Sequence, residues 1–194
     1  EISIKAAGYL LSTYHSDLVY FKQYQEFISN RISKQEYLTK GEGCFQSFIN
    51  EYRIARNVKA SKIGNLLDTF TEFRYSPQPE DVQRLAKEFQ SLGYTWNKLA
   101  VSLASKLLFL ANPSYFLPVD RRVRNAFSLK QNDYSAYFEK VHTFWENESS
   151  SYQDVYLKLE AELVYIENDF PGLYDLPQIR LNRYIDKVLW VMGG

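Results

Sequence analysis

Apolar residues recur at helical spacing along most of this chain. Two clear stripes lie in its middle: Leu85, Phe89 and Leu92, then Leu99, Leu103, Leu107 and Leu110. A spacing of three or four residues places such side chains on one face of a helix. No segment shows the strict apolar–polar alternation that indicates a half-buried strand. The pattern predicts an all-α protein, a compact domain of about eight or nine helices joined by short loops.

Proline, glycine and serine mark where these helices begin and end. Pro79, Glu80 and Asp81 predict a helix start, because proline suits the first turn and acids there face the positive end of the helix dipole. Gly93 predicts the end of that helix, and Asn112-Pro113 the end of the next. Further helices are predicted near residues 7–29, 44–56, 62–74, 121–128, 134–147, 151–168 and 178–192. We expect one domain over residues 1–194, built either as one body or as two lobes with a cleft between them.

Charge and hydropathy bear on the partners of the chain. The formal net charge is zero, so the molecule as a whole does not indicate a polyanionic partner. Basic residues nevertheless gather in two places: Arg53, Arg56, Lys59 and Lys62, then Arg121, Arg122, Arg124 and Lys130. These clusters suit either a basic groove or solvated helix faces. No apolar run is long enough to span a membrane, so we expect a cytoplasmic protein that does not contact one.

Cysteine and histidine are too sparse for a metal centre or a hydrolytic triad. Cys44 is the single cysteine and is expected to be a small core residue, and the two histidines, His15 and His142, lie far apart. His142 is expected to be structural. The sequence contains no glycine-rich fingerprint for a nucleotide or dinucleotide. We therefore expect neither a metal nor a cofactor. We also expect a monomer.

One acidic residue stands out at a predicted helix start. Pro118-Val119-Asp120 follows an apolar helix and a proline-bearing loop, and Arg121, Arg122 and Arg124 come directly after it. Asp is a preferred N-cap residue, so Asp120 can be explained by helix capping alone. A carboxylate held at that position is also suited to catalysis, and the two roles are compatible.

The segment from Leu92 to Phe127 resembles the helix-hairpin-helix superfamily of DNA glycosylases. Members of this family have a helical hairpin that holds DNA phosphate, then an apolar helix, then a Pro-Val-Asp loop, with Val three residues after the Asp. Pro118, Val119, Asp120 and Val123 stand in that register. Two further strings resemble divergent bacterial relatives of the 8-oxoguanine glycosylases: Ala104–Pro113 and Arg183–Trp190. The resemblance implies an enzyme that removes a damaged or modified base from duplex DNA.

The chain departs from the family pattern in two places. The family hairpin usually holds two glycines, whereas the turn here has only Gly93, followed by Thr95. The lysine with which bifunctional members form a Schiff base would fall near Ser102, and Lys106 lies one helical turn later on the same face. Lys106 can replace that lysine, bind phosphate or only extend its head to solvent. A monofunctional hydrolase is favoured.

The resemblance assigns roles to a small set of residues. Asp120 would stabilise the positive charge that develops on the sugar and would orient or deprotonate the attacking water. Arg121, Arg122 and Arg124, with Gly93 and Thr95 of the hairpin turn, would contact DNA. The extruded base needs an aromatic pocket, for which the candidates are Tyr94, Trp96, Tyr115 and Trp145.

Two other functions remain open at this point. The chain can be a non-enzymatic helical module that binds DNA or protein on the same scaffold, which the single hairpin glycine and the zero net charge favour. It can also be an unrelated helical interaction protein in which Pro-Val-Asp is a chance match. If it is a glycosylase, the residues do not separate DNA repair from defence against phage DNA.

Overall fold

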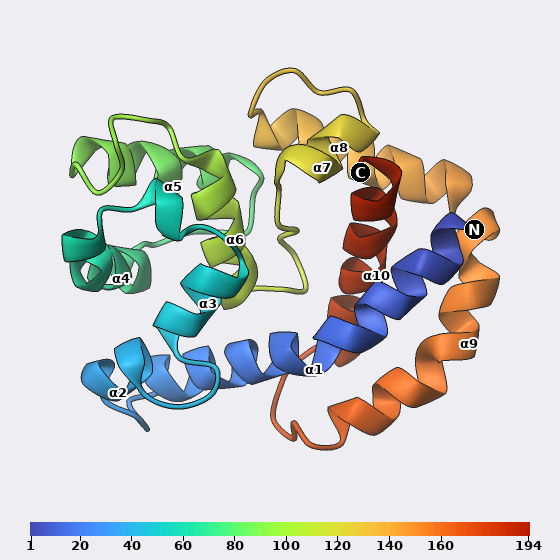
Figure 1. Cartoon of the computed structure of the whole chain (residues 1–194), viewed down its shortest axis with the longest axis horizontal. Coiled ribbons are helices and arrows are strands. Elements are labelled where there is room, and N and C mark those ends of the chain that lie inside the picture. Colours follow the sequence, from blue (N-terminus) through green and yellow to red (C-terminus); the bar gives the residue numbers. More distant parts are fainter.

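The computed structural model describes all 194 residues and contains helices without any β-strand (Figure 1). The all-α prediction is therefore confirmed. Ten α-helices and two short 3-10 turns make up the chain: α1 (Ile2–Ile28), α2 (Lys34–Thr39), α3 (Phe45–Glu51), η1 (Ala55–Asn57), η2 (Ala60–Lys62), α4 (Ile63–Glu72), α5 (Glu80–Ser91), α6 (Val101–Ala111), α7 (Arg121–Ala126), α8 (Tyr134–Glu148), α9 (Ser150–Glu167) and α10 (Leu176–Met192).

The first and last helices pack against each other. α1 contacts α10, and α9 and α6 also contact α1. α7 packs on α10, while α2 to α5 gather at the opposite end of the molecule (Figure 1). One connected cluster of 43 buried residues runs through both ends, so the two groups of helices share a core.

Most predicted helices are present, and the differences have local causes. The predicted helix over 44–56 is shorter, because α3 ends at Glu51 and Arg53 takes a left-handed φ of 55°. The N–H of Ile54 then donates to the carbonyl of Ile49, which closes the helix end. The helix α2 was not predicted, although Ser33 and Glu36 form a capping box that starts it.

The segment from α5 to α6 forms a helical hairpin. α5 begins with Glu80 and Asp81 in its first turn and ends where Gly93 adopts φ 69°. The N–H of Tyr94 donates to the carbonyl of Phe89 and completes that helix end. α5 and α6 pack against each other, so the predicted helix-hairpin-helix-like element is present.

No helix of the protein combines the length and the apolar character that crossing a bilayer requires.

Candidate functional site

Asp120 is the N-cap residue of α7. Its Oδ1 accepts hydrogen bonds from the backbone N–H groups of Arg122 (2.8 Å) and Val123 (3.2 Å). Its Oδ2 makes no hydrogen bond within the chain, and the residue is partly exposed. The capping role is therefore present, and it leaves one carboxylate oxygen open to water or to a ligand.

The loop before Asp120 is held by side chains from three helices. Tyr134 of α8 accepts from the N–H of Leu117 and donates to its carbonyl. Ser105 of α6 accepts from the N–H of Val119, and Asn182 of α10 donates to the carbonyls of residues 113 and 114. A buried loop satisfied in this way has little freedom. Asp120 is thus carried at the end of a fixed segment.

Lys106 is a buried amine among the charged neighbours of Asp120. Its side chain projects from α6, and Nζ donates to the backbone carbonyl of Tyr52 over 2.9 Å. Burial lowers the pKa of Lys106, while the carboxylates of Asp120 and Asp186 act in the opposite direction. Arg53 and Arg56 lower it further. The two residues predicted to be catalytic, Asp120 and Lys106, therefore influence each other electrostatically but form no ion pair or hydrogen bond with each other.

A buried ionic network of Arg183, Asp17 and Asp186 lies near Lys106. Arg183 of α10 contacts Asp17 of α1 and Asp186, with nitrogen–oxygen distances of 2.7 and 2.8 Å. The hydroxyl of Tyr52 donates to the other oxygen of Asp17. Burial raises the pKa of Asp186, and the Arg183 guanidinium opposes that rise. The network ties α1, α10 and the end of α3 together beside Lys106.

The sequence analysis did not identify Asp186 or Arg183 as site residues. A signal was available, because these two charged residues stand three apart on a helix that also carries the apolar stripe of Leu181, Ile185 and Val188. The partner Asp17, however, is 166 residues away from Arg183 along the chain. No local pattern in the sequence links them.

The three arginines after Asp120 have different environments. Arg121 is exposed, and Arg124 is half-buried in the last turn of α7. The guanidinium of Arg122 lies over the ring of Trp190, 3.8 Å from its centroid. None of the three forms a salt bridge within the chain. Arg121 and Arg122 are both exposed beside Asp120, but Arg122 is engaged with an aromatic side chain.

The hairpin residues predicted to contact DNA are occupied by the hairpin itself. The N–H of Gly93 donates to the carbonyl of Gln90. Thr95 is fully buried, and its hydroxyl donates to the carbonyl of Lys98. Contact of a phosphate with the Gly93 N–H or the Thr95 hydroxyl would therefore require these bonds to break.

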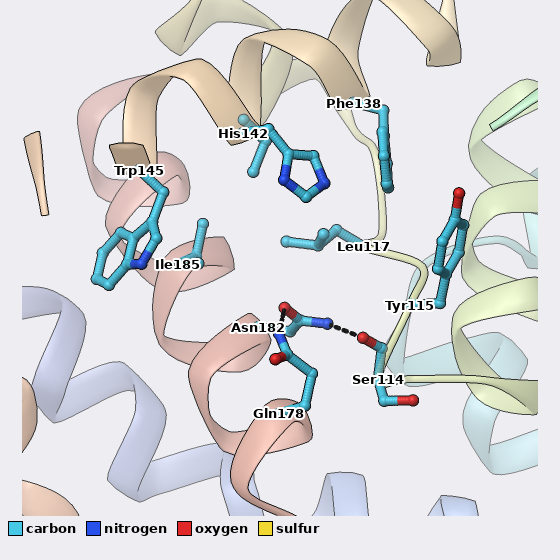
Figure 2. Close-up of a pocket in the computed structure, with 10 residues that line it drawn as sticks. Ser114, Tyr115, Leu117, Phe138, His142, Trp145, Gln178, Asn182 and Ile185 are labelled. Carbon is cyan, nitrogen blue, oxygen red and sulfur yellow. Dashed lines mark hydrogen bonds between the residues drawn. The ribbon is translucent and has the colours of Figure 1, made fainter. Parts of the chain in front are cut away.

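The four aromatic residues predicted for a base pocket lie in two separate regions. Tyr94 is buried at the hairpin, where its hydroxyl shares a 3.1 Å hydrogen bond with Thr69. Trp96 is 60% exposed, and the ammonium of Lys59 lies 5.6 Å from its ring centroid. Tyr115 and Trp145 line one pocket of about 340 Å³ between α8, α10 and the loop before α7 (Figure 2). Asp120 is not among the residues that line it.

No group of three His, Cys, Asp or Glu side chains is placed to hold a metal ion.

No family model, no curated protein and no solved structure matches the chain. The resemblance to helix-hairpin-helix glycosylases therefore stays an expectation from the sequence, from Leu92–Phe127 and Arg183–Trp190.

Proposed function

We propose that the protein is a DNA glycosylase that hydrolyses the N-glycosidic bond of a damaged or modified base. One observation carries the proposal: Asp120 is fixed by the N-terminus of α7, has one unbonded oxygen, and is a charged neighbour of the buried amine Lys106. In this proposal the enzyme acts as a cytoplasmic monomer on duplex DNA, in repair or in defence against phage.

The chemistry needs a carboxylate more than any other group. Cleavage of the bond between C1′ and the base leaves the electron pair on the base and positive charge on the sugar. Water adds to C1′, one of its protons is lost, and a proton goes to the departing base. Asp120 Oδ2 would stabilise the cationic sugar and accept the proton of the water. The two backbone N–H groups that bind Oδ1 hold the carboxylate in place, so that Oδ2 is left for this role.

Lys106 supports a monofunctional mechanism in the observed geometry. Its Nζ donates to the carbonyl of Tyr52, so the amine is held by the protein. A bifunctional lyase would need this amine to leave Tyr52 and attack C1′. We propose that Lys106 instead acts as a nearby charge beside Asp120. The site would then hydrolyse the N-glycosidic bond and would not cleave the DNA strand.

DNA contact is proposed for exposed arginines around the site. Arg121 follows Asp120 directly, and Arg53 and Arg56 are exposed residues close enough to Lys106 to affect its pKa. Cations on an exposed rim bind backbone phosphates without reading sequence. Removal of one such contact is expected to lower the dependence of log affinity on log salt concentration by about one unit of slope.

Two observations favour the alternative, a non-enzymatic DNA- or protein-binding module. Asp120 does not line the pocket of about 340 Å³, and the hairpin N–H of Gly93 is already bonded. Such a module would bind DNA without releasing a base. The two functions are therefore separated by assaying base release and DNA binding on the same preparation.

The test is incubation with duplexes that carry a panel of modified bases, followed by alkali to cleave abasic sites. The wild-type protein should release at least one base, and Asp120→Asn should not. Asp133→Ala is the matched control, since Asp133 caps α8 in the same way through Ala136 N. Release that survives Asp120→Asn would refute the assignment of Asp120. DNA binding without release across the panel would instead favour the binding module. Borohydride trapping that Lys106→Ala abolishes would show a bifunctional enzyme.

A further inference from the structure

The long helix α9 packs on the rest of the molecule through one side. Its main contacts are with α1, α8 and α10, and it lies along the outer edge of the molecule (Figure 1). On the packed side Leu163 is fully buried, and the ring centroid of Tyr156 lies 5.3 Å from that of Tyr184 on α10. Glu167, further along the same side, accepts a hydrogen bond from Tyr14 of α1. The opposite side of α9 therefore faces solvent.

The solvent side of α9 carries an apolar stripe, here called the α9 stripe. Its exposed members are Leu157 (52%), Ala161, Val164 (40%) and Tyr165 (75%). Spacings of three and four residues place these side chains on one side of the helix. A side chain of a second helix packs into a hole formed by residues i, i+3, i+4 and i+7. Such a hole is present here in Leu157, Glu160, Ala161 and Val164. The α9 stripe thus has the spacing of a helix-docking surface.

Carboxylates border the α9 stripe on both sides. Glu160 and Glu162 stand one residue before and one residue after Ala161, so they project to opposite sides of it. Asp154 is exposed near the N-terminal end of the stripe. Asp154 and Glu162 form no salt bridge within the chain, and Glu160, which forms one, is still 49% exposed. Lys158 is the only basic residue of α9. The stripe is therefore an apolar surface with a negative border.

This border distinguishes among possible occupants of the α9 stripe. Nucleic acids and anionic membrane surfaces carry the same sign of charge and would be repelled. A second copy docked through the same face would set carboxylates against carboxylates, which disfavours a symmetric pair. A helix that carries Lys or Arg beside its own apolar stripe matches both the charge and the spacing.

We propose that the outer face of α9 docks a cationic amphipathic helix of a partner protein. The apolar side chains of that helix pack on the α9 stripe, one of them over the small side chain of Ala161. Its lysines and arginines pair with Asp154, Glu160 and Glu162. The surface does not use Asp120, so the inference stands whether or not the chain excises bases.

The test uses two synthetic peptides of about 20 residues, long enough to form a helix. Both carry leucine at heptad positions a and d, and the other positions are rich in lysine in one peptide and in glutamate in the other. Fluorescence anisotropy measures binding of each labelled peptide to the full chain at about 0.15 M salt, where attraction between distant exposed charges is screened. The lysine peptide should bind with a dissociation constant in the micromolar range, and the glutamate peptide should not bind.

Leu157→Lys should weaken binding of the lysine peptide by about tenfold or more, because it removes an apolar contact and adds a like charge. Ile28→Lys is the matched control, since Ile28 at the end of α1 is 51% exposed and Leu157 is 52% exposed. This control should bind the peptide as the wild type does. Glu162→Gln removes one unpaired carboxylate and should weaken binding by about two- to fivefold. Circular dichroism checks that each variant is folded.

Failure of the lysine peptide to bind the folded wild-type protein would overturn the proposal. Equal binding of the two peptides would also overturn it, because the negative border would then select nothing. Equal losses in Leu157→Lys and Ile28→Lys would place the peptide elsewhere on the surface. A dimer of the chain alone, detected by sedimentation and lost in Leu157→Lys, would make this face an interface between copies and would refute a cationic partner. Asp120→Asn should bind the peptide normally, so a failure of docking is distinguished from a failure of base release.

Discussion

Arg183 and Asp17 form a buried ion pair between the last helix and the first, with nitrogen–oxygen distances of 2.7 Å and side chains only 2% exposed. Each charge is compensated by the other, since neither side chain reaches solvent. The pKa of Asp186 is affected by the same guanidinium, so loss of Arg183 would leave two carboxylates without their cation.

Arg183→Ala is expected to lower the free energy of unfolding by about 3–5 kcal/mol, because it leaves Asp17 buried and unpaired. Urea denaturation followed by circular dichroism measures this loss. The surface pair of Arg31 and Glu26 is the control, since Arg31 is 69% exposed and Arg31→Ala should cost less than about 1 kcal/mol. Equal effects of the two substitutions would contradict the central role of the buried pair.

The capping role of Asp120 and its proposed catalytic role can be separated by substitution. Asp120→Asn keeps an oxygen that can accept from the N–H groups of Arg122 and Val123, so stability should change little. Asp120→Ala removes the cap and should cost about 1 kcal/mol. Base release should be lost in both variants. Asp133→Ala should lose the same amount of stability as Asp120→Ala and should still release the base. If base release instead fell in parallel with stability in Asp120→Asn, Asp120→Ala and Asp133→Ala, the loss of release would reflect unfolding and not the loss of a catalytic group.

Lys106 should make stability depend on pH in the alkaline range. Burial lowers its pKa below the usual 10.5, so between the lowered value and 10.5 the unfolded chain binds more protons than the folded one. The contribution of Lys106 to the free energy of unfolding therefore increases as pH rises through that window. Relative to Lys106→Met, the wild-type protein should become steadily more stable as pH approaches 10.5.

Denaturant titrations at neutral, mildly alkaline and strongly alkaline pH measure this difference. Lys187 is present in both proteins, so its own lowered pKa cancels in the comparison. Lys87→Met, on the exposed side of α5, controls for loss of a lysine side chain. A difference between wild type and Lys106→Met that does not vary with pH would contradict the burial of this amine.

Two glycines should respond to alanine in opposite directions. A Cβ at Gly193 would lie 1.8 Å from the carbonyl oxygen of Arg122, so Gly193→Ala must displace the end of α10 from α7. We expect a loss of about 1–3 kcal/mol. Gly8 lies inside α1 with nothing within 4 Å of an added Cβ, so Gly8→Ala should gain about 0.4–1 kcal/mol. Thermal denaturation of the two variants gives the sign of each change, and a Gly193→Ala variant as stable as the wild type would contradict the close packing of α10 on α7.

Helical periodicity and local stop signals were enough to predict much of the fold. Gly93 ends α5 as expected, and α10 spans nearly the predicted residues. Periodicity failed where backbone conformation decides the outcome: a left-handed Arg53 ended α3 early, and nothing in the apolar pattern shows this. The capping box at Ser33 and Glu36 was readable, and with it α2 could have been found.

The site was predictable only in part, for a physical reason. Asp120 has a local signature, a proline-bearing loop followed by a short helix, and Lys106 shares the apolar helix before it. Asp17 and Asp186 owe their position beside these residues to the pairing of α1 with α10. The pocket of Trp145 and Tyr115 likewise needs α8, α10 and a loop together. Proximity across the whole chain is not encoded in any single segment.

The pairing of α1 with α10 has a consequence for synthesis of the protein. During translation α1 emerges before α10, so the part of its buried face that packs on α10, with Asp17 within it, lacks that partner until α10 leaves the ribosome. While residues 29–175 are being synthesised, the nascent chain must shield that face by transient collapse or by binding a chaperone. A ribosome stalled before residue 176 should therefore carry a protease-sensitive chain, and emergence of α10 should convert it to a resistant one.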